Sequence, residues 1–203
     1  MKTASEMYQV FKRSISDYHL EDNIDFPIKN PFEVNSYDQL LYQKNWIDTV
    51  QWHLEDIIRD PKIDPENALK IKRRIDASNQ DRTDLVEKID DHYLEAFRDV
   101  EVEKNTRINT ESPAWAIDRL SILALKIYHM EVEANRTDLA KELLDKNKFK
   151  LRVLMTQLED LSTAIDQLLE DLQKGKRIMK IYRQMKMYND PELNPVLYAQ
   201  NKS

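Results

Sequence analysis

Apolar positions recur every three or four residues over most of the chain, which is the spacing of one face of an α-helix. The longest such run lies between residues 138 and 173 and forms a heptad seam typical of a coiled coil. Its positions are Leu144, Asn147, Leu151, Leu154, Leu158, Leu161, Ile165, Leu168 and Leu172. A shorter seam within residues 37–59 comprises Ile47, Val50, Leu54 and Ile57. The pattern predicts an all-α protein.

Capping residues set the expected helix boundaries. Ser36, Asp64 and Ser112 are good N-cap residues, and the latter two precede a proline, which suits the first helical turn. Gly175 suits the position just after a helix end, because glycine adopts the left-handed conformation without strain. The expected helices span about 37–59, 65–97, 113–134 and 138–173.

These helices predict an antiparallel helical bundle of about four main helices, paired as two helical hairpins, over residues 36–173. Residues 1–35 are expected to form an irregular N-terminal arm with a short helix over 4–18, because two prolines interrupt the pattern that follows. Residues 174–203 are expected to form a basic C-terminal helical tail.

Composition excludes several classes of site. The chain has one glycine, so it cannot build a Rossmann fingerprint or a P-loop, each of which needs several. It has no cysteine, which excludes disulfides, thiolate metal sites and a cysteine nucleophile. No long uncharged apolar run and no signal-peptide core are found. We therefore expect no transmembrane segment and a cytoplasmic protein.

Charge is unevenly distributed along the chain. The net charge is −6, while residues 174–188 carry six basic side chains and no acid, so the remainder carries −6 − 6 = −12. An acidic body disfavours nucleic acid as a partner. The basic segment fits either weak contact with an anionic membrane or a phosphorylated ligand, or a terminal helix docked on the acidic body.

A polar break interrupts the apolar stripe of the second expected helix at Ser78, Asn79 and Arg82. Side chains buried there need partners, because an unpaired buried charge is very costly. One interpretation is a polar pocket with Arg82 as an anion anchor. The other, which we favour, is an internal pair between Arg82 and a carboxylate that fixes the helix register.

Two further helix faces carry polar and charged side chains that could form a binding site. Asp48, Trp52, Glu55 and Arg59 share a stripe opposite the short seam, which fits either a second packing face or a binding face. On the third helix one sector carries Asp118, Arg119, Lys126, His129 and Glu133, which fits a partly buried flank. No histidine has the Glu-x-x-His spacing of di-iron bundles, so the sequence predicts no metal role for His129.

One acid-rich pattern suggests magnesium. Glu87 and Asp90 have the spacing E-x-x-D, and Asp56 lies on the preceding helix. Carboxylates that share a helix face suit a hard cation. The arrangement resembles in part the MazG-like nucleoside triphosphate pyrophosphatases, which add E-x-x-E on the other helix. Gln51 and Ile58 stand where that element requires acids, so the resemblance is incomplete.

Longer blocks of sequence resemble the DUF4254 family, a bacterial family of unknown function. They are residues 52–59, 79–84, 111–130, 157–161 and 186–195, and the likeness extends from about Trp46 to Tyr198. The resemblance implies no catalytic residues. It implies that genes of the family lie beside genes for glycosyltransferases of envelope polysaccharide synthesis.

Two functions remain as hypotheses. The first is a non-catalytic partner or accessory protein of envelope glycan enzymes, with no cofactor, that binds a protein partner or forms a homo-oligomer. The alternative is a magnesium-dependent phosphohydrolase acting on a nucleotide or nucleotide sugar, with Mg²⁺ at Asp56, Glu87 and Asp90. The candidate ligand-binding residues are Trp52, Glu55, Arg59, Asn79, Arg82, Asp118, Lys126, Gln157 and Asp160.

Overall fold

The computed structural model of this chain describes residues 1–185, 187 and 190–200, and within them it is helical, with no strand. The helices are α1 (Ala4–Tyr18), α2 (Tyr37–Ile58), α3 (Pro65–Ala96), α4 (Pro113–Ala134), α5 (Lys141–Gln173) and α6 (Pro195–Gln200). The all-α class is therefore confirmed. In this part of the chain, no helix combines the length and apolarity needed to cross a membrane.

The caps explain why the helix boundaries lie close to the expected ones. The Ser36 side chain accepts a hydrogen bond from the Gln39 backbone N–H, and Asp64 does the same for Asn67. Ser112 precedes α4 without capping it, and its hydroxyl instead donates to the Asp90 carboxylate on α3. That contact ties the start of α4 to the end of α3.

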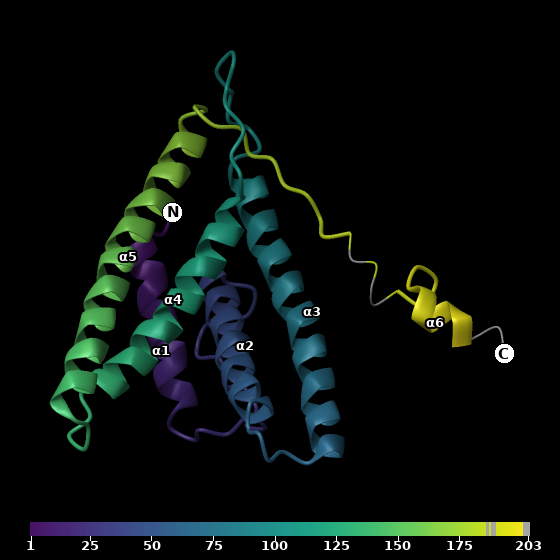
Figure 1. Cartoon of the computed structure of the whole chain (residues 1–203). Coiled ribbons are helices and arrows are strands. Elements are labelled where there is room, and N and C mark those ends of the chain that lie inside the picture. Colours follow the sequence, from purple (N-terminus) through teal and green to yellow (C-terminus); the bar gives the residue numbers. More distant parts are fainter. Residues whose placement is uncertain (186, 188–189, 201–203) are drawn as a thin grey trace.

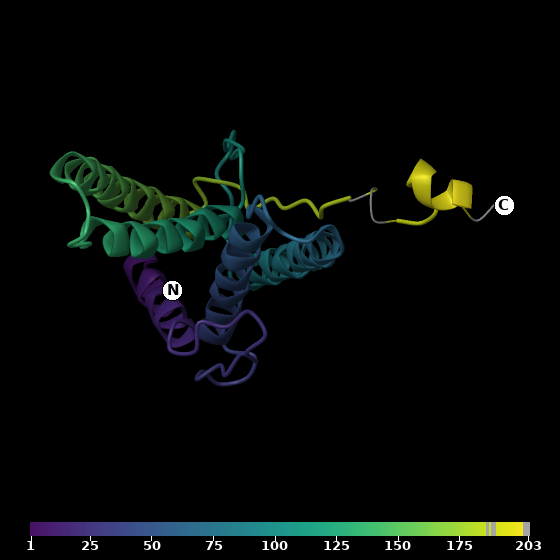
Figure 2. The same cartoon turned by 60° about the horizontal axis from the view of Figure 1, so that its bottom comes forward.

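Two helical hairpins, α2–α3 and α4–α5, form most of the bundle (Figure 1). Figure 2 shows α4 between α5 on one side and the α1–α2 pair on the other. Every position of the long seam on α5 is buried or half-buried, and α5 packs mainly against α4. The core is one apolar cluster to which α1 to α5 all contribute, with a small second cluster around Leu54, Ile71 and Ile75.

The N-terminal segment is more than the irregular arm that we expected. Helix α1 buries a complete apolar face, including Phe11 and Ile15, in the main core. A capping box between Thr3 and Glu6 fixes its first turn, and the Ala4 backbone N–H donates to Asp166 of α5 over 2.7 Å. Only residues 19–36 are irregular, so α1 is an integral part of the bundle.

The helix expected within residues 174–188 is absent from the part of that segment that the structure describes. Residues 178–185 are extended and run past α3 (Figure 1), where Arg183 forms ion pairs with Glu87 and Asp91. Docking on acidic side chains of the body is thus observed, without the helix. Lys186 and Tyr188, which belong to the same basic segment, lie outside the described residues.

Gly175 should not tolerate a side chain. Its φ is +69°, and a Cβ added there would lie 2.0 Å from the Glu101 carbonyl oxygen. We expect Gly175→Ala to lower the free energy of unfolding by at least about 1–2 kcal/mol from left-handed strain alone, with the clash adding to it. Urea denaturation would measure the loss. The exposed neighbour Lys176→Ala is the control, and equal midpoints for the two variants would contradict the argument.

Candidate functional site

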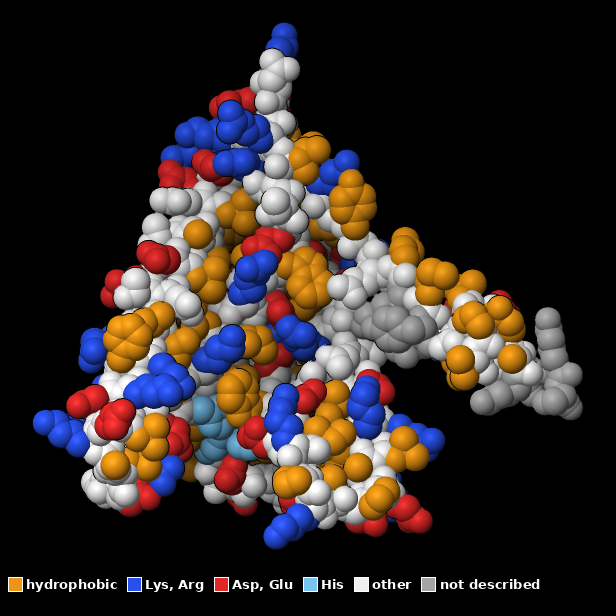
Figure 3. All heavy atoms as spheres, in the orientation of Figure 1, with side chains coloured by type: hydrophobic (Ala, Val, Ile, Leu, Met, Phe, Trp, Pro, Cys, Tyr) orange, Lys and Arg blue, Asp and Glu red, His pale blue; other side chains and the backbone are white. Residues whose placement is uncertain are grey.

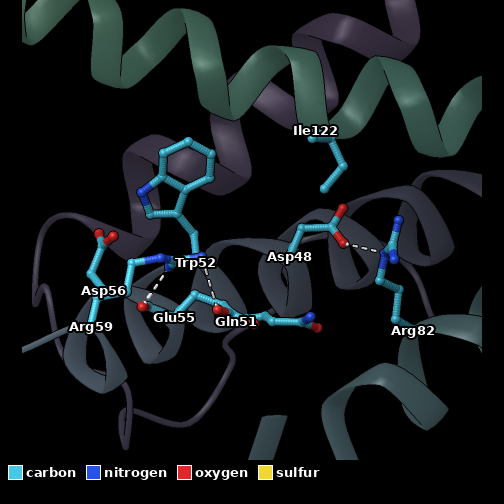
Figure 4. Close-up of a pocket in the computed structure, with 8 residues that line it drawn as sticks. All are labelled: Asp48, Gln51, Trp52, Glu55, Asp56, Arg59, Arg82 and Ile122. Atoms are coloured by element: carbon cyan, nitrogen blue, oxygen red, sulfur yellow. Dashed lines mark hydrogen bonds and ion pairs between the residues drawn. The ribbon is translucent and has the colours of Figure 1, made fainter. Parts of the chain in front are cut away.

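The second half of α2 forms one wall of a pocket of about 470 Å³, which we call the polar pocket. Residues three or four positions apart on a helix share a face, so the predicted stripe of Asp48, Trp52, Glu55 and Arg59 lies together along this wall. Arg82 of α3 and Ile122 of α4 face it (Figure 4). The remaining lining residues are Gln51 and Asp56.

Four charged side chains meet at the inner end of this pocket, and we call them the buried quartet: Lys44 and Asp48 of α2, Arg82 of α3 and Asp118 of α4. The Lys44 ammonium pairs with Asp48 and lies 2.6 Å from Asp118 Oδ1. The Arg82 guanidinium pairs with Asp118 and lies 3.1 Å from Asp48 Oδ1. Cations and carboxylates therefore alternate around a closed ring with no net charge.

Neutral donors complete the surroundings of the quartet. The Ser121 hydroxyl donates to Asp48 Oδ2 over 2.6 Å and accepts from the Asn45 side-chain amide over 2.9 Å. Burial raises the pKa of Asp48, while Lys44 and the hydrogen bond from Ser121 act in the opposite direction. Arg82 is the most exposed member, with 26% of its side chain accessible. Because two carboxylates already balance Arg82 and Lys44, the internal pair that we favoured is observed and Arg82 is not a free anion anchor.

The rest of the polar break in α3 is also satisfied internally. The Ser78 hydroxyl donates to the Gln51 side-chain oxygen over 3.1 Å, and the Gln51 amide donates to Asn79 over 2.9 Å. Arg59 pairs with Glu55 at the outer end of the pocket, where their side chains are 3.0 Å apart. The pocket wall is thus a set of mutually bonded polar groups.

A second hollow of about 400 Å³ lies on the other side of Trp52, and its surface consists almost entirely of apolar atoms. We call it the apolar groove. It is lined by Trp52, Lys126, His129, Met130, Glu133, Phe149, Lys150, Val153 and Leu154, from α2, α4 and α5. Trp52 belongs to both hollows, and its indole stacks on the His129 ring at 4.7 Å with an interplanar angle of 7°.

The candidate residues therefore separate into groups. Trp52, Glu55, Arg59 and Arg82 line the polar pocket, while Asn79 and Asp118 support it from behind through hydrogen bonds and ion pairs. Lys126 lies beside the apolar groove. Gln157 and Asp160 are exposed on α5 and line neither hollow.

The structure does not bring together the acids expected to hold magnesium. Asp90 accepts hydrogen bonds from the Ser112 hydroxyl and the Ala114 backbone N–H, and Glu87 is engaged by the tail. Asp56 lies in the polar pocket. Since Arg82 contacts Asp48 and the two helices are antiparallel, Asp56 and Glu87 lie in opposite directions from that contact, about 20 Å apart along the axes. Asp90 is a structural residue that anchors the start of α4.

Three histidines converge beneath Trp52, an arrangement that the sequence analysis missed. His19 follows α1, His53 lies on α2 and His129 on α4, and one ring nitrogen of each lies within 4.8 Å of the others. Burial lowers the pKa of His53, and burial followed by the neighbouring histidines lowers that of His129 to about 4. No spacing rule could reveal them, because each belongs to a different element.

The family model described as "Protein of unknown function (DUF4254)" matches residues 38–181. The match covers well over half of the 203 residues, so the chain belongs to this family. It includes α2 to α5 and therefore the polar pocket, the apolar groove and the buried quartet. No curated protein and no solved structure matches the chain.

Removing one charge from the buried quartet should strongly destabilise the fold. In Lys44→Met, Arg82 alone must compensate two buried carboxylates, and we expect a loss of about 3–5 kcal/mol in the free energy of unfolding. The double variant Lys44→Met/Asp118→Asn keeps the Asp48–Arg82 pair, so it should lose less than the sum of the single variants.

Chemical denaturation followed by circular dichroism would measure these differences. Lys72→Met is the control, because it removes an exposed pair with Asp76 that has little influence on stability. Strict additivity in the double variant, or equal losses for Lys44→Met and Lys72→Met, would show that the quartet is not a coupled unit.

Proposed function

We propose that this member of the DUF4254 family is a non-catalytic, cytoplasmic binding protein that docks an acidic amphipathic helix of a partner protein in the apolar groove. The observation that carries the proposal is the groove itself. Phe149 and Val153 stay 58% and 41% exposed beside a hollow lined almost entirely by apolar atoms. Exposed apolar surface that is contiguous and concave is typical of interaction sites.

The shape of the groove favours a helix as its occupant. It lies between α4 and the first half of α5, with Trp52 of α2 at its inner end. An amphipathic helix inserts apolar side chains at positions i, i+3 or i+4 and i+7 into a groove of this kind. Trp52 and Phe149 supply aromatic surface, which contributes strongly to binding energy in protein interfaces.

Charge around the groove indicates the chemistry of the partner. Lys126 and Lys150 line the groove together with one acid, Glu133. Lys146, Lys148 and Arg152 lie on the same part of α5, which has no acid between Asp145 and Glu159. Figure 3 shows Lys and Arg side chains beside hydrophobic ones on the lower part of α5. This basic border contrasts with the acidic net charge of the whole chain. A helix with acidic residues flanking its apolar face would complement it.

The resemblance to the family implies a bacterial setting beside glycosyltransferases of envelope glycan synthesis, and we propose such an enzyme as the first partner to test. The magnesium-dependent phosphohydrolase is less well supported, because its acids lie apart and already have other partners. The competing outcome is a homo-oligomer in which a second copy of this chain occupies the groove. The experiment must distinguish that copy from a different partner protein.

A charge introduced into the groove should weaken partner binding strongly. In Val153→Glu a carboxylate would be buried in the apolar interface, and a penalty of about 2 kcal/mol corresponds to roughly 30-fold weaker binding. The measurement is co-purification from the source cells with quantitative mass spectrometry, using the full chain as bait. Met155→Glu is the matched control, because Met155 is 39% exposed on α5 but does not line the groove.

The proposal requires a protein that is recovered with the wild type and with Met155→Glu but is lost with Val153→Glu. A cross-link between that protein and Lys150 would place it at the groove. Equal recovery with all three baits would overturn the proposal. If sedimentation shows that the lost partner is a second copy of this chain, the groove is a self-association surface instead.

A further inference from the structure

We propose that His19, His53 and His129 bind one transition-metal ion of the zinc class through their Nε2 atoms. Within the residues that the structure describes, this is the group of metal-ligating side chains that converges closely enough to share an ion. The site lies outside the polar pocket. It shares His129 with the lining of the apolar groove, but its argument does not rest on partner docking there. Nothing in the family match assigns it.

The spacing of the ring nitrogens fits tetrahedral coordination. His19 Nε2 and His53 Nε2 are 3.3 Å apart. Two imidazole nitrogens bound to zinc at about 2.0–2.1 Å in tetrahedral geometry are separated by about 3.3–3.4 Å. The chosen nitrogen of His129 lies within 4.8 Å of both, so small rotations of the rings would complete a three-nitrogen face.

Hydrogen bonding orients His19 and leaves His129 Nε2 without a partner. His19 Nδ1 lies 2.7 Å from the Ile15 carbonyl oxygen, which can only accept, so Nδ1 carries the proton and Nε2 is left with its lone pair. A backbone carbonyl in this position is the usual orienting partner of a metal-bound histidine. His129 Nε2 is buried and has no hydrogen-bond partner, which is unusual for a buried polar atom unless a ligand completes it.

The surroundings suit a divalent ion that prefers nitrogen. Burial lowers the pKa of both His53 and His129, which favours the neutral form of imidazole that coordinates a metal ion. Three imidazoles favour zinc, cobalt, nickel or copper over magnesium, which prefers oxygen. Asp22 Oδ1 lies 3.9 Å from His53 Nε2 and is a carboxylate available for the fourth position, which water can otherwise fill.

Aromatic rings enclose the cluster and hold its members in place. Tyr18 stacks on His53 with centroids 5.1 Å apart, and Tyr128 packs against His19 at 4.3 Å. Trp52 covers the outer face of His129. Packing of this kind restricts ring rotation, so the nitrogens would be organised for a ligand before it binds.

The test is titration of the chelator-treated full chain with Co²⁺ and Zn²⁺. We expect one equivalent of Co²⁺ to produce the intense visible absorption of tetrahedral cobalt, and Zn²⁺ to displace it. Zinc at about 100 times its dissociation constant should raise Tm by about 5–10 °C. His129→Gln and His53→Gln should each weaken binding on the order of 100-fold or more. His92→Gln is the control, because His92 stacks on Tyr37 away from the cluster and should bind as the wild type does.

X-ray absorption of the wild-type zinc complex keeps the test independent of how the variants fold. Three imidazole ligands would support the site. An absence of stoichiometric binding to the wild type, fewer than three imidazoles in the absorption spectrum, or unchanged affinity in folded His129→Gln would overturn it. In that case the contact between His19 and His53 is an ordinary hydrogen bond between the two rings.

Discussion

Lys44, Asp48, Arg82 and Asp118 bring two cations and two carboxylates into the bundle where α2, α3 and α4 converge, and the arrangement of those helices depends on their mutual compensation. Taking each ion out of water is costly, and only good geometry with additional hydrogen bonds offsets that cost. The alternating ion pairs and the hydrogen bond from Ser121 contribute to that compensation. A slip of one helical turn, about 5.4 Å, would separate the charges, so the quartet fixes register as well as proximity.

With this register fixed, the outer half of α2 contributes side chains both to the two hollows and to the histidine cluster. Trp52 and His53 are neighbours in sequence, so their side chains leave the helix about 100° apart. Trp52 lies between the polar pocket and the apolar groove, while His53 turns toward α1 and the other histidines. Neither hollow would exist in this form if α2 were rotated by one position, because the stripe would then face the core.

Local signals predicted the parts of the fold that short-range chemistry decides. Ser36 and Asp64 cap α2 and α3 as expected, and the polar break at Arg82 correctly predicted an internal ion pair. Burial of Lys44 could not be predicted, because it depends on how several helices are rotated against one another. The helix expected within residues 174–188 was wrong for the part that the structure describes, for a related reason. The Gly175 carbonyl accepts a hydrogen bond from the Glu103 backbone N–H and Arg183 pairs with α3, so tertiary contacts override helix propensity.

The histidine cluster shows why spacing rules fail for a site assembled across elements. His19, His53 and His129 come from three segments, and only the packing of α1 against both α2 and α4 brings them together. Trp52 then stacks flat on His129. The lone pair of an imidazole nitrogen lies in the ring plane, so a ring stacked on one face leaves Nε2 free to point at the other histidines. One tryptophan can therefore form part of the groove and support the cluster without competing for the same atoms.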